Sequence, residues 1–259
     1  MVHFEFSVLD WCATAPGLVT SDEWLTWAKA APVFPHPILT DVPALSDMPA
    51  MMRRRLNRVG RMACHVAYGC DNGHTADAIV FASRYGDTHK ALSLLGDLVK
   101  GEPLSPTGFG MSVHNAIAAQ YGIARNHLGN AVVVAGAQAT VAAAMVEASA
   151  LLHDGADEVL VVFYETPLPG GYPTFHDENN CEYAWAWRVG IVDHSAALAR
   201  VRINYIDGDL AVPEPLDQWP SGLKVLRHFL RQLSPEGATQ DDLVCGQSFG
   251  AQTRWEIHA

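Results

Sequence analysis

Apolar residues along the chain follow patterns typical of strands in some segments and of helices in others. Residues 2–7 alternate, with Val2, Phe4 and Phe6 on one face, which predicts a half-buried strand. Other apolar runs are unbroken and predict buried strands, with helical patterns between them. Further strands are expected at 77–82, 130–137, 157–165, 184–192 and 199–206, and helices at 20–30, 48–69 and 87–100, after Asn115, and at 139–152 and 222–234.

Capping residues and glycines mark several helix ends. Thr20 and Glu23 have the spacing of a capping box, which predicts a helix at the residues that follow. Gly101 and Gly155 come after two helical patterns and are expected to end them. The alternation of strands and helices favours an α/β fold, with helices layered around a mixed, largely parallel sheet. We expect a single domain over residues 1–259.

Composition and charge narrow the possible functions. Of the 259 residues, 49% are hydrophobic and 17% are charged, and the net charge of −11 makes binding to nucleic acid or anionic lipid unexpected. The apolar runs are too short for a membrane span, and the N-terminus lacks the pattern of a secretion signal. The five cysteines have no C-x-x-C spacing, which favours reduced thiols and a cytoplasmic protein. No cofactor is expected.

The segment VVVAGAQATVAAAMVEASALLHDG, residues 132–155, has the pattern of a buried strand, a tight turn and a helix of small residues. Enzymes with such a turn place a nucleophilic Ser or Cys there, where N–H groups at the start of the helix stabilise negative charge. This chain has Gln138 at that position. A carboxamide is not a nucleophile, so covalent catalysis by Gln138 is excluded. The alternative is an ordinary polar residue at the start of a helix.

Residues 104–164 resemble part of the N-terminal half of a β-ketoacyl synthase, in the thiolase superfamily. The stretch AGAQATVAAA matches the nucleophile turn of that family, with Gln138 in place of the catalytic Cys, and DGADEVLVV matches the next turn and strand. The resemblance extends over residues 1–165. It implies a thiolase-like fold whose C-terminal catalytic half, with two histidines and a lysine, is missing or much shortened. Residues 166–259 would then be a divergent segment that completes the domain.

Replacement of Cys by Gln in a short chain resembles the chain length factors of this family, most of all those of bacterial aryl polyene synthesis. The stretches FASRYGD and SVHNA are also similar to that branch. The resemblance implies a non-catalytic subunit that forms a heterodimer with a full-length ketosynthase and shapes its acyl tunnel. It also implies an acyl carrier protein as a partner, in polyketide, aryl polyene or fatty-acid-like biosynthesis.

The same resemblance implies which residues contact the partner. The strand that contains Val133 would lie at the twofold interface, where two subunits extend one sheet. The loop and helix TGFGMSVHNA would line the far end of the tunnel, and a close-packed wall there would limit the acyl chain. The alternative for Phe109 and Met111 is that they fill this subunit's own core. The implied tunnel and interface residues are Phe109, Met111, Val113, His114, Val133 and Gln138.

Two other hypotheses stay open. A divergent acyltransferase or malonyl decarboxylase could use His114 or one of the cysteines, although a hydrogen-bonded pair of His114 and Asn115 at a helix start is simpler. A second alternative is a scaffold that only stabilises the ketosynthase. No metal is expected, because zinc ligands have more regular spacing than the neighbouring residues Cys64, His65, Cys70 and His74.

Charged residues gather in two segments. The helix expected at 48–69 contains a cluster of arginines, for which a solvated face is the simpler interpretation. The alternative is docking of an acidic partner, such as an acyl carrier protein or the ketosynthase, through Arg54, Arg58 and Arg61. The segment 176–182 places His176 among acidic residues and is expected to be a solvated loop.

Overall fold

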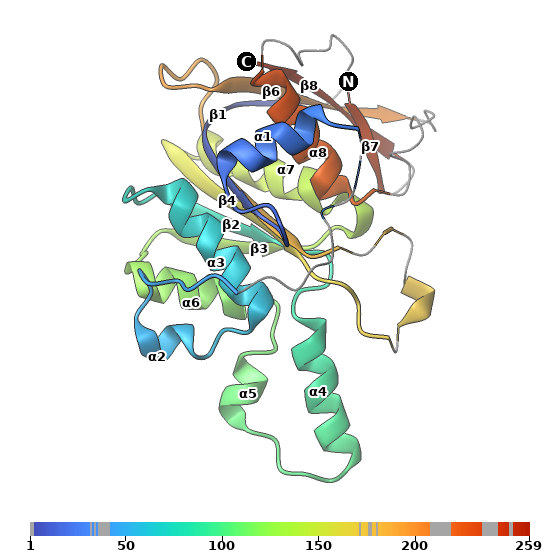
Figure 1. The fold of residues 1–259 in the computed structure, drawn as a ribbon. Coiled ribbons are helices and arrows are strands. Elements are labelled where there is room, and N and C mark those ends of the chain that lie inside the picture. Colours follow the sequence, from blue (N-terminus) through green and yellow to red (C-terminus); the bar gives the residue numbers. More distant parts are fainter. Residues whose placement is uncertain are drawn as a thin grey trace.

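The structure is a computed structural model that describes residues 3–31, 33, 35, 42–170, 172–175, 178–179, 181–207, 219–234, 243–248 and 251–259. These residues form an eight-stranded sheet with helices on both faces (Figure 1), in the strand order β3-β2-β4-β5-β1-β6-β8-β7. The strands are β1 His3–Thr14, β2 Ala78–Ala82, β3 Asn130–Val134, β4 Glu158–Glu165, β5 Tyr183–Gly190, β6 Ala199–Asp207, β7 Leu243–Ser248 and β8 Ala251–His258. The helices are α1 Ser21–Lys29, α2 Ala50–Arg53, α3 Arg58–Asp71, α4 Thr88–Val99, α5 Pro106–Gly110, α6 Ala116–Arg125, α7 Thr140–His153 and α8 Ser221–Gln232, with short 3-10 turns η1 Ala137–Ala139 and η2 Pro173–Phe175.

The sheet is mixed, as expected, but fewer of its strands are parallel than the sequence suggested. Strand β2 pairs in parallel with β3 and β4, and the other neighbouring strands of the described sheet pair antiparallel. A parallel pair needs a long crossover, usually a helix, and helices α4 to α7 lie in the crossovers that link β2, β3 and β4. The chain instead passes from β4 to the antiparallel strand β5 through the segment 166–182, in which η2 is the only helical turn described.

The interior of the sheet is buried on both faces because the side chains of a strand alternate between them. In β4, Val161 and Phe163 pack in the cluster that includes α1, α7 and α8. Leu160 and Val162 of the same strand pack in the opposite cluster, which includes α3 and α6. The unbroken apolar run of this strand is thus explained, and its predicted burial is confirmed.

Local signals place most helix ends correctly. The Thr20 hydroxyl accepts the Glu23 N–H at 3.3 Å, and the Glu23 carboxylate accepts the Thr20 N–H at 2.8 Å, so the predicted capping box is confirmed. The expected helix at 48–69 is wrong in one respect, because it consists of α2 and α3. Asn57 interrupts it by capping α3, with its side-chain oxygen 3.1 Å from the Gly60 N–H.

Two features differ from the pattern along the sequence. Strand β1 is longer than expected and fully buried from Phe6 to Leu9, because it lies between β5 and β6 inside the sheet. Strands β7 and β8 were not expected, and they extend the sheet beyond β6. No helix within the described ranges is long and apolar enough to cross a membrane.

Candidate functional site

The turn that contains Gln138 lies at the carboxyl end of β3. Strand β3 leads into η1, and α7 begins at Thr140, so the predicted strand, turn and helix are confirmed. Ala137 has a φ of 49°, a left-handed conformation that is uncommon for a residue with a Cβ. The Thr140 hydroxyl holds this turn, donating to the Ala137 carbonyl at 2.7 Å and accepting the Gly136 N–H at 3.0 Å.

Gln138 is half-buried in this turn, and the backbone of β7 lies beside η1. Strand β7 therefore approaches the turn at which the resemblance places a nucleophile. The amide of Gln138 can donate and accept hydrogen bonds, but it cannot form an acyl intermediate as a thiolate does.

Four of the five cysteines lack the environment of a catalytic thiol. Cys64 and Cys70 are buried, and Cys12 and Cys181 are half-buried. Burial raises the pKa of Cys12 to about 11, with the nearby Asp10 carboxylate adding to the effect, and it also raises the pKa of the other three thiols. A raised pKa disfavours the thiolate, which is the nucleophilic form. Within the described ranges, no group of three or more His, Cys, Asp or Glu side chains could hold a metal ion.

A carboxylate that was not predicted from the sequence lies at the carboxyl edge of β2 and β4. Glu165, the last residue of β4, accepts the Arg84 N–H at 2.5 Å and the Ser83 hydroxyl at 3.4 Å. The Arg84 guanidinium is 3.3 Å from the Glu178 carboxylate. Desolvation raises the pKa of Glu165 to about 8, against the opposing effect of the Arg84 N–H. In the sequence, this site is marked by a charged residue at the end of a buried apolar strand.

The expectation that segment 176–182 is a solvated loop is wrong for two of its acidic residues. Glu178 pairs with Arg84, and Glu182 pairs with Arg58 at 2.6 Å, and all four side chains are largely shielded. Arg84 lies in the loop after β2, and Arg58 lies in α3. Their ion pairs with the two carboxylates therefore tie this loop and α3 to the segment 176–182. His176 lies outside the described residues.

Of the three arginines proposed for docking a partner, Arg54 is the exposed one. Arg58 is half-buried and makes the ion pair with Glu182. Arg61 is also half-buried, and its Nε donates to the Leu56 carbonyl at 3.4 Å. Arg58 is therefore a structural residue, and a docking role would have to rest mainly on Arg54.

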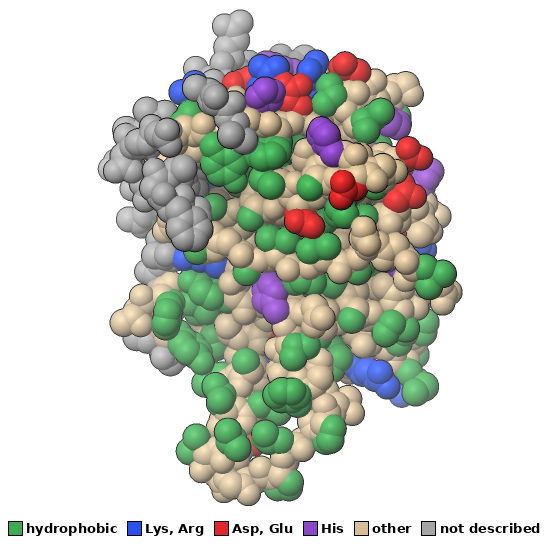
Figure 2. All heavy atoms as spheres, turned by 180° about the vertical axis from the view of Figure 1, so that it is seen from behind, with side chains coloured by type: hydrophobic (Ala, Val, Ile, Leu, Met, Phe, Trp, Pro, Cys, Tyr) green, Lys and Arg blue, Asp and Glu red, His purple; other side chains and the backbone are tan. Residues whose placement is uncertain are grey.

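Helices α4 and α5 form an arm, residues 88–113, that extends away from the sheet (Figure 1). None of its residues is buried, and hydrophobic side chains gather over it (Figure 2). Phe109 is 60% exposed, so the alternative that it fills this subunit's core is wrong. Met111 is half-buried against the cluster that includes α3 and α6. The exposed apolar residues of the arm are Leu92, Leu95, Leu98, Val99, Leu104, Phe109 and Val113.

His114 lies at the base of this arm. Its Nε2 is 3.0 Å from the Ser83 carbonyl oxygen, and its ring lies against Gly86. A Cβ at Gly86 would be 2.7 Å from the His114 ring, and φ there is 62°, so this position requires glycine. The expected hydrogen bonding is thus found for His114, with Ser83 as its partner, whereas Asn115 occupies the N-cap of α6 without a side-chain capping bond.

Strand β3 is an edge of the sheet. It pairs with β2, and no other described strand pairs with its outer side. Asn130 and Ala131 are exposed, and Val132, Val133 and Val134 are half-buried, so the expected burial on both faces is not found in the isolated chain. An apolar edge strand is a surface to which a strand of another chain can pair.

Comparisons with known proteins agree with this geometry. The profile described as "Beta-ketoacyl synthase, N-terminal domain" matches residues 24–242. The chain is similar to one in the complex of the ketosynthase ApeO with its chain length factor ApeC from Xenorhabdus doucetiae, at 26% identity and a TM-score of 0.80, over 96% of this chain and 98% of that chain. A search of curated proteins gives no match.

Two more distant structures show the same fold. The ishigamide ketosynthase/chain length factor is 16% identical, with a TM-score of 0.63 over 79% of this chain and 67% of that chain. A β-ketoacyl synthase from Burkholderia phymatum STM815 is 13% identical, with a TM-score of 0.62 over 91% and 70%. The expected thiolase-like α/β fold is therefore confirmed, and the profile match spans most of the sequence. The chain belongs to the family of β-ketoacyl synthase N-terminal domains.

Proposed function

We propose that this protein is a non-catalytic chain length factor that forms a heterodimer with a β-ketoacyl synthase and shapes its acyl tunnel. The observations that carry the proposal are two exposed apolar features, the edge strand β3 and the arm, together with Gln138 at the turn where the resemblance places a nucleophile. The similarity to a chain of a ketosynthase complex with its chain length factor supports it.

The arm supports assembly because its apolar side chains have no cover in the isolated chain. Leu95 is 50% exposed, Leu98 is 58% exposed and Val99 is 87% exposed. Burial of one such side chain is worth about 1.5–3 kcal/mol when it is complete. A partner that covers the arm would therefore gain binding free energy from several side chains. Strand β3, at the edge of the sheet, offers a second contact surface, where its main-chain groups could pair with a strand of the partner.

The chemistry of Gln138 and of four of the five cysteines supports a non-catalytic role. Gln138 cannot be acylated. Burial disfavours the thiolate at four of the five cysteines, Cys12, Cys64, Cys70 and Cys181. The His114 ring is engaged with the Ser83 carbonyl. The condensation chemistry would therefore be performed by the partner's own residues.

The arm and its base would form the part of the complex that limits acyl length. Phe109 is exposed and Met111 is half-buried against the body, so the first would project into the partner and the second would anchor the arm. Of the other implied interface residues, Val113 is exposed, and His114 and Val133 are half-buried. The pathway would be aryl polyene or related polyketide or fatty-acid-like synthesis. The exposed Arg54 would assist docking of an acyl carrier protein.

The assembly is tested by co-expressing this chain with an affinity-tagged β-ketoacyl synthase from the same organism. Co-purification in a defined ratio is expected. Leu98→Glu should abolish it, because the charge would have to be desolvated in the interface. Ile191→Glu is the matched control, since Ile191 is 57% exposed and lies outside the arm and β3.

Two outcomes would contradict the proposal. One is that the two proteins purify separately and each is well folded alone. The other is that Leu98→Glu and Ile191→Glu assemble equally well. If the complex forms but Phe109→Ala and Met111→Ala leave product length unchanged, the protein is a stabilising scaffold and does not set the chain length.

A further inference from the structure

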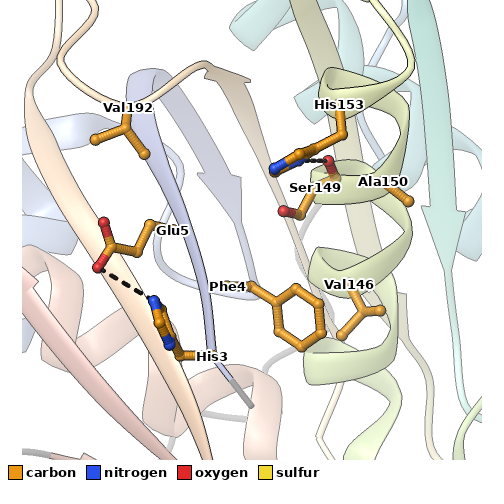
Figure 3. A pocket seen from close by; sticks show the side chains of 8 residues that line it. All are labelled: His3, Phe4, Glu5, Val146, Ser149, Ala150, His153 and Val192. Atoms are coloured by element: carbon orange, nitrogen blue, oxygen red, sulfur yellow. Dashed lines mark hydrogen bonds and ion pairs between the residues drawn. The ribbon is translucent and has the colours of Figure 1, made fainter.

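A groove of about 480 Å³ lies between the start of β1 and helix α7 (Figure 3). Small-molecule sites commonly have volumes of roughly 300–1,000 Å³, so the groove is large enough for a ligand. No residue of β3 or of the arm lines it, so it is separate from the proposed assembly surface. Its lining residues are His3, Phe4, Glu5, Val146, Ser149, Ala150, His153 and Val192.

The walls of the groove are partly apolar. The Phe4 ring points toward Val146 of α7, and Val192 approaches from the loop after β5 (Figure 3). Ala150, which is exposed on α7, leaves open space because its side chain is small. These four side chains could cover a short aliphatic or aromatic group.

Polar groups face each other across the groove. On α7, the Ser149 hydroxyl and the His153 ring point into the space, and Glu5 and His3 lie on the opposite side (Figure 3). The His153 Nδ1 is 2.8 Å from the Ser149 carbonyl oxygen and donates to it. In the neutral ring, Nε2 is therefore unprotonated and can accept a hydrogen bond.

The opposite side also offers an acceptor. The Arg200 guanidinium is 2.6 Å from the Glu5 carboxylate, and the hydrogen bond between them holds the pKa of Glu5 below its usual value. Arg202 makes a further ion pair with this carboxylate. Glu5 is thus anionic near neutral pH, and Arg200 and Arg202 supply the positive charges beside it. The His3 Nε2 lies 4.0 Å from Glu5 Oε1.

We infer that this groove binds a small amphipathic molecule whose head group donates hydrogen bonds, an aliphatic alcohol or amine. The apolar part would lie on Phe4, Val146, Ala150 and Val192. The head group would donate to His153 Nε2 or to the Glu5 carboxylate, two acceptors that an anionic head group could not use. The site is independent of the proposed heterodimer, and either can fail without the other.

Saturation-transfer NMR and calorimetric titration of the full chain test the inference with hexan-1-ol, hexylamine and hexanoate, which share one tail length. The alcohol and the amine should bind. Hexanoate should bind about tenfold more weakly, because it can accept from the Ser149 hydroxyl but cannot donate to His153 Nε2 or Glu5. Ala150→Trp should abolish binding by filling the groove. Ala119→Trp is the control, because Ala119 is exposed on α6.

His153→Phe supplies a second variant that keeps the ring but removes the acceptor, and it should weaken hexan-1-ol binding by about threefold or more. The inference is overturned if none of the three probes binds, or if all three bind alike. It is also overturned if Ala150→Trp binds hexan-1-ol as well as the parent and the Ala119→Trp control do.

Discussion

Glu165 makes the stability of this protein dependent on pH. Its folded pKa of about 8 lies above the ordinary value of 4.5, so the folded state binds the proton more tightly than the unfolded state. The stabilisation is complete below pH 4.5 and is lost as pH rises through 8. At about 1.4 kcal/mol per pH unit, the limit is about 5 kcal/mol. Because Glu165 is half-buried, solvent screening reduces this limit, and we expect a loss of about 2–3 kcal/mol.

Glu165→Gln removes the titration but keeps an oxygen that can accept the Arg84 N–H. Its free energy of unfolding should therefore lack the loss that Glu165 causes as pH rises through 8, and above pH 8 the variant should be more stable than the parent. Urea unfolding at a series of pH values from 5 to 9 measures both quantities. Glu102→Gln, at an exposed position, is the control. Parallel pH profiles for the parent and Glu165→Gln would refute the reasoning.

Other predictions concern a cap, a glycine and the turn. Thr20→Ala should lower the free energy of unfolding by about 1 kcal/mol through loss of the capping box. Urea unfolding measures this, and an unchanged free energy would contradict the prediction. Gly222→Ala should cost about 1–3 kcal/mol or prevent folding, because a Cβ there would lie 2.5 Å from the Phe163 ring; an unchanged melting temperature would contradict this. In a ketosynthase complex, Gln138→Ala should retain condensation activity. The Gln138→Cys variant, assayed without the ketosynthase, should show no condensation activity. A loss of turnover in an intact Gln138→Ala complex would reveal a chemical role.

Local patterns allowed much of the fold to be predicted. The capping box at Thr20, the helix stops at Gly101 and Gly155, and the buried run of β4 depend on neighbouring residues, and each is found as expected. The turn at Gln138 was predictable for the same reason, since strand, turn and helix are adjacent in sequence.

Features that depend on distant segments could not be predicted. Strand β3 has the composition of a buried strand, but its position at the sheet edge is set by the strand order. The partners of Glu165 come from Ser83 and Arg84, about eighty residues away in the chain, so no local spacing indicates the cluster. The arginines of α3 suggested a solvated face, yet Arg58 meets Glu182 of the segment before β5.

The central claim is that β3 and the arm contact a β-ketoacyl synthase. Hydrogen–deuterium exchange of this chain, alone and mixed with a β-ketoacyl synthase from the same organism, tests it most directly. The account predicts slower exchange over residues 88–113 and 130–134 in the mixture, with little change over the groove between β1 and α7. Unchanged exchange in both segments, or protection confined to other surfaces, would contradict it.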